Sequence, residues 1–118
     1  MIIQMCGLSG SGKSTIANKT KNILEENSIA VEIIDGDEYR TNVCSDLGFS
    51  KEDRHSNIRR LSFIASKFSA HNIVTIICVI NPYEQIREEV FDKYQNVKTI
   101  FIDCNLETLK KKIQKGYT

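Results

Sequence analysis

The residues with the clearest chemical potential lie near the start of the chain, in a glycine-rich run that ends in a lysine and a serine. Four residues lie between Gly7 and Gly12, and Lys13 and Ser14 follow directly, which matches the phosphate-binding pattern G-x-x-x-x-G-K-[ST]. In such a loop the backbone N–H groups surround a phosphate, the lysine neutralises the β- and γ-phosphates, and the hydroxyl binds Mg²⁺. We therefore predict a nucleoside triphosphate site with Ser14 as the metal ligand, formed by Gly7, Leu8, Ser9, Gly10, Ser11, Gly12, Lys13, Ser14 and Thr15.

Two aspartates form a second candidate group. Asp35 and Asp37 follow a short apolar run and flank Gly36. In phosphoryl transfer a carboxylate orients the acceptor hydroxyl and takes its proton, so at least one of the two is a candidate for that role. An Asp-Gly turn that only ends a strand carries equal weight on the sequence alone.

A third group lies between residues 48 and 60. Arg54, Asn57 and Arg60 are spaced three residues apart and are expected to share roughly one helix face, which would suit an anionic ligand that also needs amide hydrogen bonds. Taken alone, such a run is more often a solvated, salt-bridged helix. Phe49, just before it, would by the same reasoning more often be a core residue than a stacking surface.

Composition predicts one globular domain over residues 1–118, with 41% hydrophobic and 26% charged residues. A net charge of +1 gives no reason to expect nucleic acid or an anionic membrane as a partner. We expect a cytoplasmic protein, because no apolar run approaches a membrane span and no signal peptide fits ahead of Gly7. The four cysteines and two histidines lack metal-ligand spacing, and we expect structural roles for them.

Apolar runs alternate with helical patterns along the chain. This order predicts an α/β domain, a P-loop nucleoside triphosphate hydrolase-like three-layer sandwich whose mostly parallel sheet has about four strands. Ligands are expected at the carboxyl ends of the strands, where Asp35, Asn81 and Asp103 fall. Strands are expected over Ile2–Cys6, Ala30–Ile34, Ile73–Ile80 and Lys98–Ile102, and helices over Lys13–Asn27, Glu38–Val43, Ser50–Ala70, Tyr83–Tyr94 and Leu106–Lys115.

Five sequence blocks together carry a resemblance to a known family: G-L-S-G-S-G-K-S-T, D-G-D-E-Y-R, D-L-G-F-S-K-E-D-R-H-S-N-I-R-R, I-N-P-Y-E-Q-I-R-E-E-V and L-E-T-L-K-K-K-I-Q-K-G-Y. They resemble the adenylylsulfate kinases along nearly the whole chain. The third block is the most specific, because other small-molecule kinases share only the phosphate loop. The resemblance implies transfer of the γ-phosphate of ATP, with Mg²⁺, to the 3′-hydroxyl of adenosine 5′-phosphosulfate, giving 3′-phosphoadenylylsulfate.

The resemblance also implies roles for particular residues. Asp37 falls at the position of the catalytic carboxylate, and Lys13 bridges the transferred phosphate. Phe49 falls at the aromatic residue that stacks on the substrate's adenine. The implied substrate site comprises Asp35, Arg40, Phe49, Arg54, Asn57, Ile80, Asn81 and Pro82.

Departures from the family pattern leave alternatives open. Asn81 replaces a serine often described as a phosphoserine intermediate, which direct in-line transfer does not need. Asn42, Cys44 and Asn81 could favour another nucleotide hydroxyl, such as that of cytidine diphosphoramidate in capsule biosynthesis.

Members of the family continue into a lid and a further strand. By the resemblance, this chain is expected to end where that lid begins. Weak ATP binding and slow turnover are therefore expected. A nucleotide-binding module without catalytic function is a third interpretation. Related enzymes are often dimers, so a homodimer is compatible with the resemblance, although no feature of the sequence identifies an interface.

Overall fold

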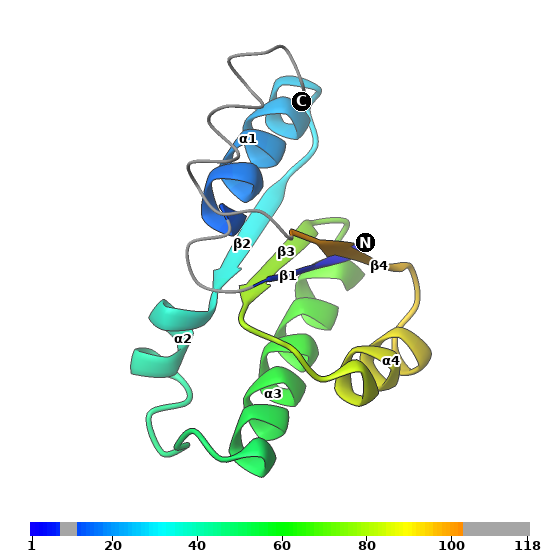
Figure 1. Ribbon diagram of the computed structural model, residues 1–118. Coiled ribbons are helices and arrows are strands. Elements are labelled where there is room, and N and C mark those ends of the chain that lie inside the picture. The colour runs from blue at the N-terminus through cyan, green and yellow to red at the C-terminus, as the bar shows by residue number, and fades with distance from the viewer. Residues whose placement is uncertain (8–11, 103–118) are drawn as a thin grey trace.

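Four parallel strands form one sheet with the order β2-β3-β1-β4 (Figure 1). The structure, a computed structural model, describes residues 1–7 and 12–102. The register places Met5 of β1 opposite Cys78 of β3 and Ile100 of β4, so the carboxyl ends of these strands meet at one edge. The strands are β1 (Ile2–Cys6), β2 (Val31–Asp35), β3 (Val74–Val79) and β4 (Val97–Phe101).

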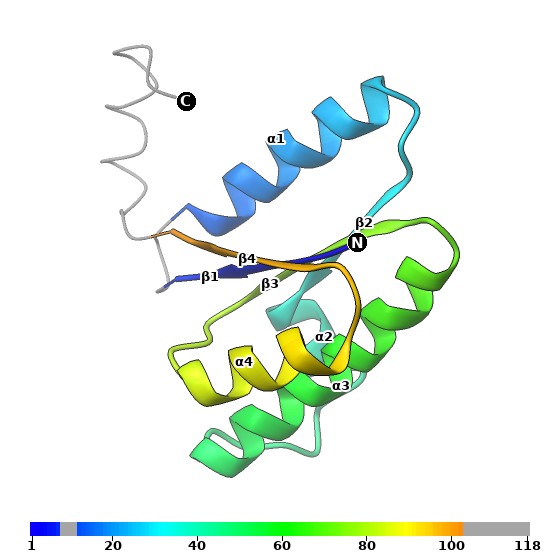
Figure 2. The same ribbon diagram turned by 90° about the vertical axis from the view of Figure 1, so that its right-hand side faces the viewer.

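Helices cover both faces of this sheet. Helix α1 (Lys13–Glu26) lies on one face, and helices α3 (Lys51–Ala70) and α4 (Glu84–Lys93) lie on the other (Figure 2). The short helix α2 (Gly36–Asn42) follows β2 directly at the carboxyl edge. The predicted α/β three-layer architecture with a parallel sheet is therefore confirmed.

The alternation of side chains along the strands divides the core in two. Neighbouring residues such as Ile2 and Ile3 point to opposite faces of the sheet. An apolar strand therefore contributes side chains to both halves of the core. The smaller half, under α1, contains Ile3, Met5, Ala17, Val31, Ile76 and Cys78. The larger half, under α3 and α4, contains Ile2, Ile34, Cys44, Ile58, Leu61, Ala65, Ile77, Val79, Ile86, Val90 and Val97.

The observed boundaries of β1 match the predicted ones, and those of the other described elements differ by at most two residues. The largest shift is in α2, which begins at Gly36 rather than Glu38 because the Asp35 side chain caps it. Strand β2 correspondingly extends one residue further, to Asp35, and β4 begins and ends one residue earlier than predicted. The predicted last helix, Leu106–Lys115, lies outside the described residues.

The remaining sequence expectations concern cysteines, histidines and membrane spans. Cys6, Cys44 and Cys78 are buried and form no disulfide, as expected for small hydrophobic side chains, and Cys104 lies outside the described residues. The His55 ring packs edge-on against Tyr83 at a centroid distance of 5.0 Å, and His71 caps the C-terminus of α3. Within residues 1–7 and 12–102, no helix is long and apolar enough to cross a bilayer.

Candidate functional site

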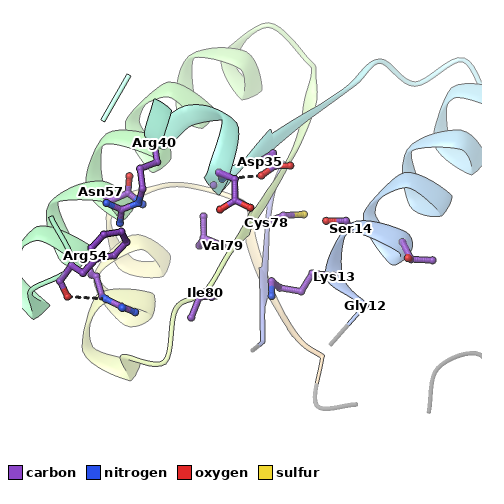
Figure 3. A pocket seen from close by; sticks show the side chains of 14 residues that line it. Gly12, Lys13, Ser14, Asp35, Arg40, Arg54, Asn57, Cys78, Val79 and Ile80 are labelled. Carbon is purple, nitrogen blue, oxygen red and sulfur yellow. Dashed lines mark hydrogen bonds between the residues drawn. The ribbon is translucent and has the colours of Figure 1, made fainter. Parts of the chain in front are cut away.

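A cavity of about 470 Å³ opens at the carboxyl edge of the sheet, where the sequence predicted ligands to gather (Figure 3). Lys13 and Ser14 lie on one side, Arg40, Arg54 and Asn57 lie on the opposite side, and the end of β3 lies between them. Segments far apart in the sequence thus line one cavity. The lining residues are Gly12, Lys13, Ser14, Thr15, Asp35, Gly36, Asp37, Arg40, Phe49, Arg54, Asn57, Cys78, Val79 and Ile80.

The phosphate-binding side is built around the start of α1. Gly12 has φ 96° and ψ 14°, a left-handed conformation that glycine adopts readily, and it leads directly into the helix N-terminus. The Lys13 ammonium donates a hydrogen bond of 2.9 Å to the Gly7 carbonyl. Burial lowers the pKa of Lys13. The predicted phosphate contacts of Leu8, Ser9, Gly10 and Ser11 lie outside the described residues.

The two aspartates have different surroundings. An Asp35 carboxylate oxygen accepts a 2.9 Å hydrogen bond from the Asp37 backbone N–H and so caps α2. The Asp37 side chain is exposed and lines the cavity. Of the two carboxylates, Asp37 is therefore the better placed to meet a ligand.

Gly36 allows this arrangement. A Cβ atom on Gly36 would lie 2.8 Å from Val79 Cγ1 and 3.2 Å from the Cys78 carbonyl oxygen. Only glycine lets the start of α2 approach the end of β3 so closely. The Asp-Gly pair therefore brings the carboxylates to the cavity as well as ending the strand.

On the opposite side, two arginines surround an exposed aromatic ring. Phe49 is 71% exposed, so it is a surface residue rather than part of the core. The guanidinium carbon of Arg40 lies 4.4 Å from the Phe49 ring centroid, and that of Arg54 lies 5.9 Å from it. Arg40 Nη1 also donates to the carbonyls of Leu47 and Gly48, and Arg54 Nε donates to the Phe49 carbonyl. The cluster offers a π-face and positive charge together.

Asn57 supplies an amide to the same wall. The residue is only 7% exposed, and its Oδ1 has no hydrogen-bond partner within the described parts of the chain. A buried amide oxygen that lines a cavity is suited to accept a hydrogen bond from a ligand.

Arg60 does not share the face of Arg54 and Asn57, so that prediction was wrong. It forms two hydrogen bonds with the Asp46 carboxylate, of 2.6 and 2.8 Å. The reason is the helical period: each step of three residues falls about 60° short of a full turn, so the second step places Arg60 about 120° from Arg54.

The segment after β3 contributes less to the cavity than predicted. Ile80 lines it, but Asn81 and Pro82 are not among its described lining residues. Asn81 is 3% exposed, and its carbonyl accepts a 2.7 Å hydrogen bond from Arg87 Nη1. Substrate binding by Asn81 and Pro82 stays a prediction.

Two further lining residues from β3, Cys78 and Val79, were not assigned to the site from the sequence. Their position directly before Ile80, at the carboxyl end of a parallel strand, is the signal that could have identified them. Burial raises the pKa of the Cys78 thiol to about 11. At neutral pH this thiol is therefore protonated.

Comparison with known proteins identifies the family. Residues 1–118 match the family described as adenylylsulphate kinase. The chain belongs to the adenylylsulphate kinase family. An adenylyl-sulfate kinase of Microcystis aeruginosa is 40% identical over 114 residues, which make up 97% of this chain and 63% of that protein. The chain thus spans less than two thirds of the length of this curated family member.

Solved structures of the family have the same fold. The Mycobacterium tuberculosis APS kinase in complex with AMPPNP and APS superposes with a TM-score of 0.79 at 30% identity, covering 98% of this chain and 69% of that chain. A hexameric APS kinase from Thiobacillus denitrificans has a TM-score of 0.69 at 35% identity, covering 87% of this chain and 21% of that chain.

Proposed function

We propose that this chain contains the nucleotide sites of an adenylylsulfate kinase, which transfers the γ-phosphate of ATP to the 3′-hydroxyl of adenosine 5′-phosphosulfate. The observation that carries the proposal is the single cavity shared by Lys13 and Ser14, on one side, and by Phe49 and its two arginines, on the other. Family membership and the resemblance of the middle block support the same acceptor.

On the ATP side, the chain supplies a cation, a hydroxyl and a helix N-terminus. Lys13 is expected to leave the Gly7 carbonyl and bridge the β- and γ-phosphates. The donor set suits Mg²⁺, because the Ser14 hydroxyl and the nearby aspartates are hard oxygen ligands and Mg²⁺ takes few protein ligands beside phosphate and water. Ser14 would hold the ion, which neutralises phosphate charge when bound.

On the acceptor side, each residue has a separate task. Asp37 orients the 3′-hydroxyl and takes its proton, and its exposed carboxylate in the cavity lining supports that role. Arg40 and Arg54 neutralise the anionic phosphosulfate. Phe49 stacks on the base, and Asn57 accepts or donates a hydrogen bond at the nucleoside.

A coupled ADP-release assay with Mg-ATP tests the proposal. We expect ADP release that depends on adenosine 5′-phosphosulfate and yields 3′-phosphoadenylylsulfate, and we expect Lys13→Ala to abolish it. A cytidine diphosphate-type acceptor and a blank without acceptor are the controls. Equal turnover with the cytidine compound, or no transfer to adenosine 5′-phosphosulfate at high protein concentration, contradicts the proposal.

Two broader properties belong with this proposal. The cytoplasmic location and the homodimer expected from the sequence stay predictions. Sedimentation analysis across a range of protein concentrations would test the second, since a homodimer predicts twice the mass of the chain at high concentration.

A further inference from the structure

The segment 43–50, between α2 and α3, contains Phe49. It contacts the rest of the domain through apolar packing and through hydrogen bonds. The apolar contacts are made by two side chains: Cys44 is fully buried, and Leu47 packs against the larger half of the core. The Phe49 side chain is not packed into the core in this way, since most of its surface is exposed. The position of the ring therefore depends on contacts made by the residues around it.

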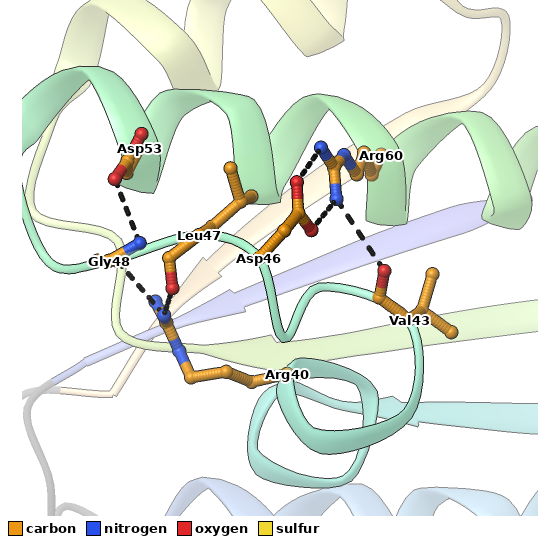
Figure 4. Close-up of polar contacts among 7 residues, drawn as sticks. All are labelled: Arg40, Val43, Asp46, Leu47, Gly48, Asp53 and Arg60. Atoms are coloured by element: carbon orange, nitrogen blue, oxygen red, sulfur yellow. Dashed lines mark hydrogen bonds and ion pairs between the residues drawn. The ribbon is translucent and has the colours of Figure 1, made fainter.

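Arg40 and Arg54, which line the cavity, make some of those contacts. Two carboxylates, one in this segment and one in α3, make others (Figure 4). Asp53, in the first turn of α3, accepts a 2.8 Å hydrogen bond from the Gly48 backbone N–H. Asp46 forms two hydrogen bonds with Arg60, which lies about two turns beyond Asp53 in the same helix. Neither the carboxylates nor Arg60 line the cavity.

The Asp53 contact differs from an ordinary helix cap. The Ser50 hydroxyl accepts a 3.1 Å hydrogen bond from the Asp53 N–H, which is half of a capping box. The Asp53 carboxylate bonds to Gly48 instead of the Ser50 backbone N–H that a capping box would use. A Cβ on Gly48 would lie 3.1 Å from Asp53 Oδ2, so a glycine leaves room for the contact. Asp53 thereby ties α3 to the residue directly before Phe49.

We propose that Asp53 and the Asp46–Arg60 pair are positioning residues, which hold Phe49 in place before a nucleotide stacks on it. The part played by the nucleotide rests on the proposed function. A ring that is already ordered loses less conformational entropy when a base binds, so these residues strengthen acceptor binding without touching the acceptor. Because none of the three residues is among the described residues that line the cavity, they should leave the chemical step unchanged.

The absence of tryptophan from the sequence allows a direct test. Phe49→Trp places a single tryptophan at the position in question, which red-edge excitation selects over the four tyrosines, and keeps an aromatic ring beside the arginines. Its anisotropy and its quenching by acrylamide are then compared in the full chain carrying Asp53→Ala or Asp46→Asn. Unfolding curves of each variant establish that the chain remains folded.

Matched controls separate positioning from general effects of charge. Glu52→Ala removes a neighbouring carboxylate from the same first helical turn as Asp53. Glu89→Gln breaks the Arg59–Glu89 pair, which is bidentate and exposed like Arg60–Asp46 but joins α3 to α4. Asp53→Asn keeps an oxygen that can accept the single Gly48 hydrogen bond and should restore most of the effect. Asp46→Asn, in contrast, loses the charge and one of the two oxygens that bind Arg60.

We expect Asp53→Ala and Asp46→Asn to lower the anisotropy of Trp fluorescence and to increase its quenching by acrylamide. Asp53→Asn, Glu52→Ala and Glu89→Gln should match the protein that carries Phe49→Trp as its single substitution. Unchanged fluorescence in Asp53→Ala and Asp46→Asn overturns the proposal. So does an equal change in the control variants, which would reflect lost helix charge rather than lost contact with the segment.

Acceptor kinetics with Phe49 restored form the second readout. We expect Asp53→Ala to raise the KM for adenosine 5′-phosphosulfate by about tenfold and Asp46→Asn by about threefold, with kcat and the KM for ATP unchanged. A fall in kcat with unchanged KM overturns the positioning role. If wild-type protein does not use this acceptor, the proposed function fails, and the fluorescence comparison still decides whether these residues hold Phe49.

Discussion

The carboxylate of Asp35 accepts a 2.9 Å hydrogen bond from the backbone N–H of Asp37. This contact assigns different tasks to two aspartates that residue types and spacing alone do not distinguish. Asp35 starts α2 as its N-cap, and the first helical turn then presents Asp37 to the cavity.

Asp37→Asn is expected to lower kcat by about 10²–10⁴-fold, because the amide cannot take the proton of the acceptor hydroxyl. ATP binding, measured by calorimetry, should be largely retained. Glu38→Gln, which removes the next carboxylate in the same helical turn, is the control and should keep normal kcat. An unchanged kcat in Asp37→Asn would exclude this residue as the base.

Asp35→Ala is expected to destabilise the protein by about 1 kcal/mol through loss of the helix cap. Asparagine caps a helix as well as aspartate does, so Asp35→Asn should retain wild-type stability. Urea unfolding of the two variants, followed by circular dichroism, gives the comparison. Equal destabilisation in both would show that the charge of Asp35, rather than its hydrogen bond, supports the fold.

Much of the fold follows from local features of the sequence. The strand runs that include Ile2–Cys6 and Val74–Val79 are apolar on both faces, which is typical of a parallel sheet covered by helices. The glycine pattern ending in Lys13 and Ser14 predicted the phosphate loop from spacing alone. These features could be recognised because each depends on a short stretch of chain.

The errors concern hydrogen bonds that the spacing of residue types does not show. Arg60 was assigned to the ligand-facing side of α3, but helical drift and the position of Asp46 direct it to segment 43–50. The start of α2 was placed two residues late because the hydrogen bond from the Asp37 N–H to Asp35 is not visible in residue types alone.

Gly36→Ala is expected to cost about 1–3 kcal/mol, because the added Cβ would overlap with Val79 Cγ1 and with the backbone of Cys78. Since α2 must shift to relieve the overlap, the variant should also lose transfer activity. Gly48→Ala is the control for stability, since its Cβ would meet only the movable end of Asp53. Equal losses of stability in the two variants, measured by urea unfolding, would contradict this account.

The lowered pKa of Lys13 predicts an alkaline limit to ATP binding. Burial disfavours the charged ammonium, so the side chain loses its proton at a lower pH than the ordinary value of 10.5. ATP affinity of the free protein should therefore fall as the pH rises toward that value. Lys13→Arg, if it binds ATP, should remove this decline because arginine stays charged. A decline that persists unchanged in Lys13→Arg would point to another group.

Cys78 offers a chemical probe of the same cavity. With a pKa of about 11, only about one thiol in a thousand is ionised at pH 8, so alkylation by iodoacetamide should be slow and should accelerate about tenfold per pH unit. Because Cys78 lines the cavity near Lys13 and Ser14, Mg-ATP should protect it (Figure 3). Peptide mass spectrometry distinguishes its labelling from that of Cys6 and Cys44, which are buried outside the described lining. Labelling of Cys78 at the same rate with and without Mg-ATP would mean that the nucleotide does not reach the end of β3.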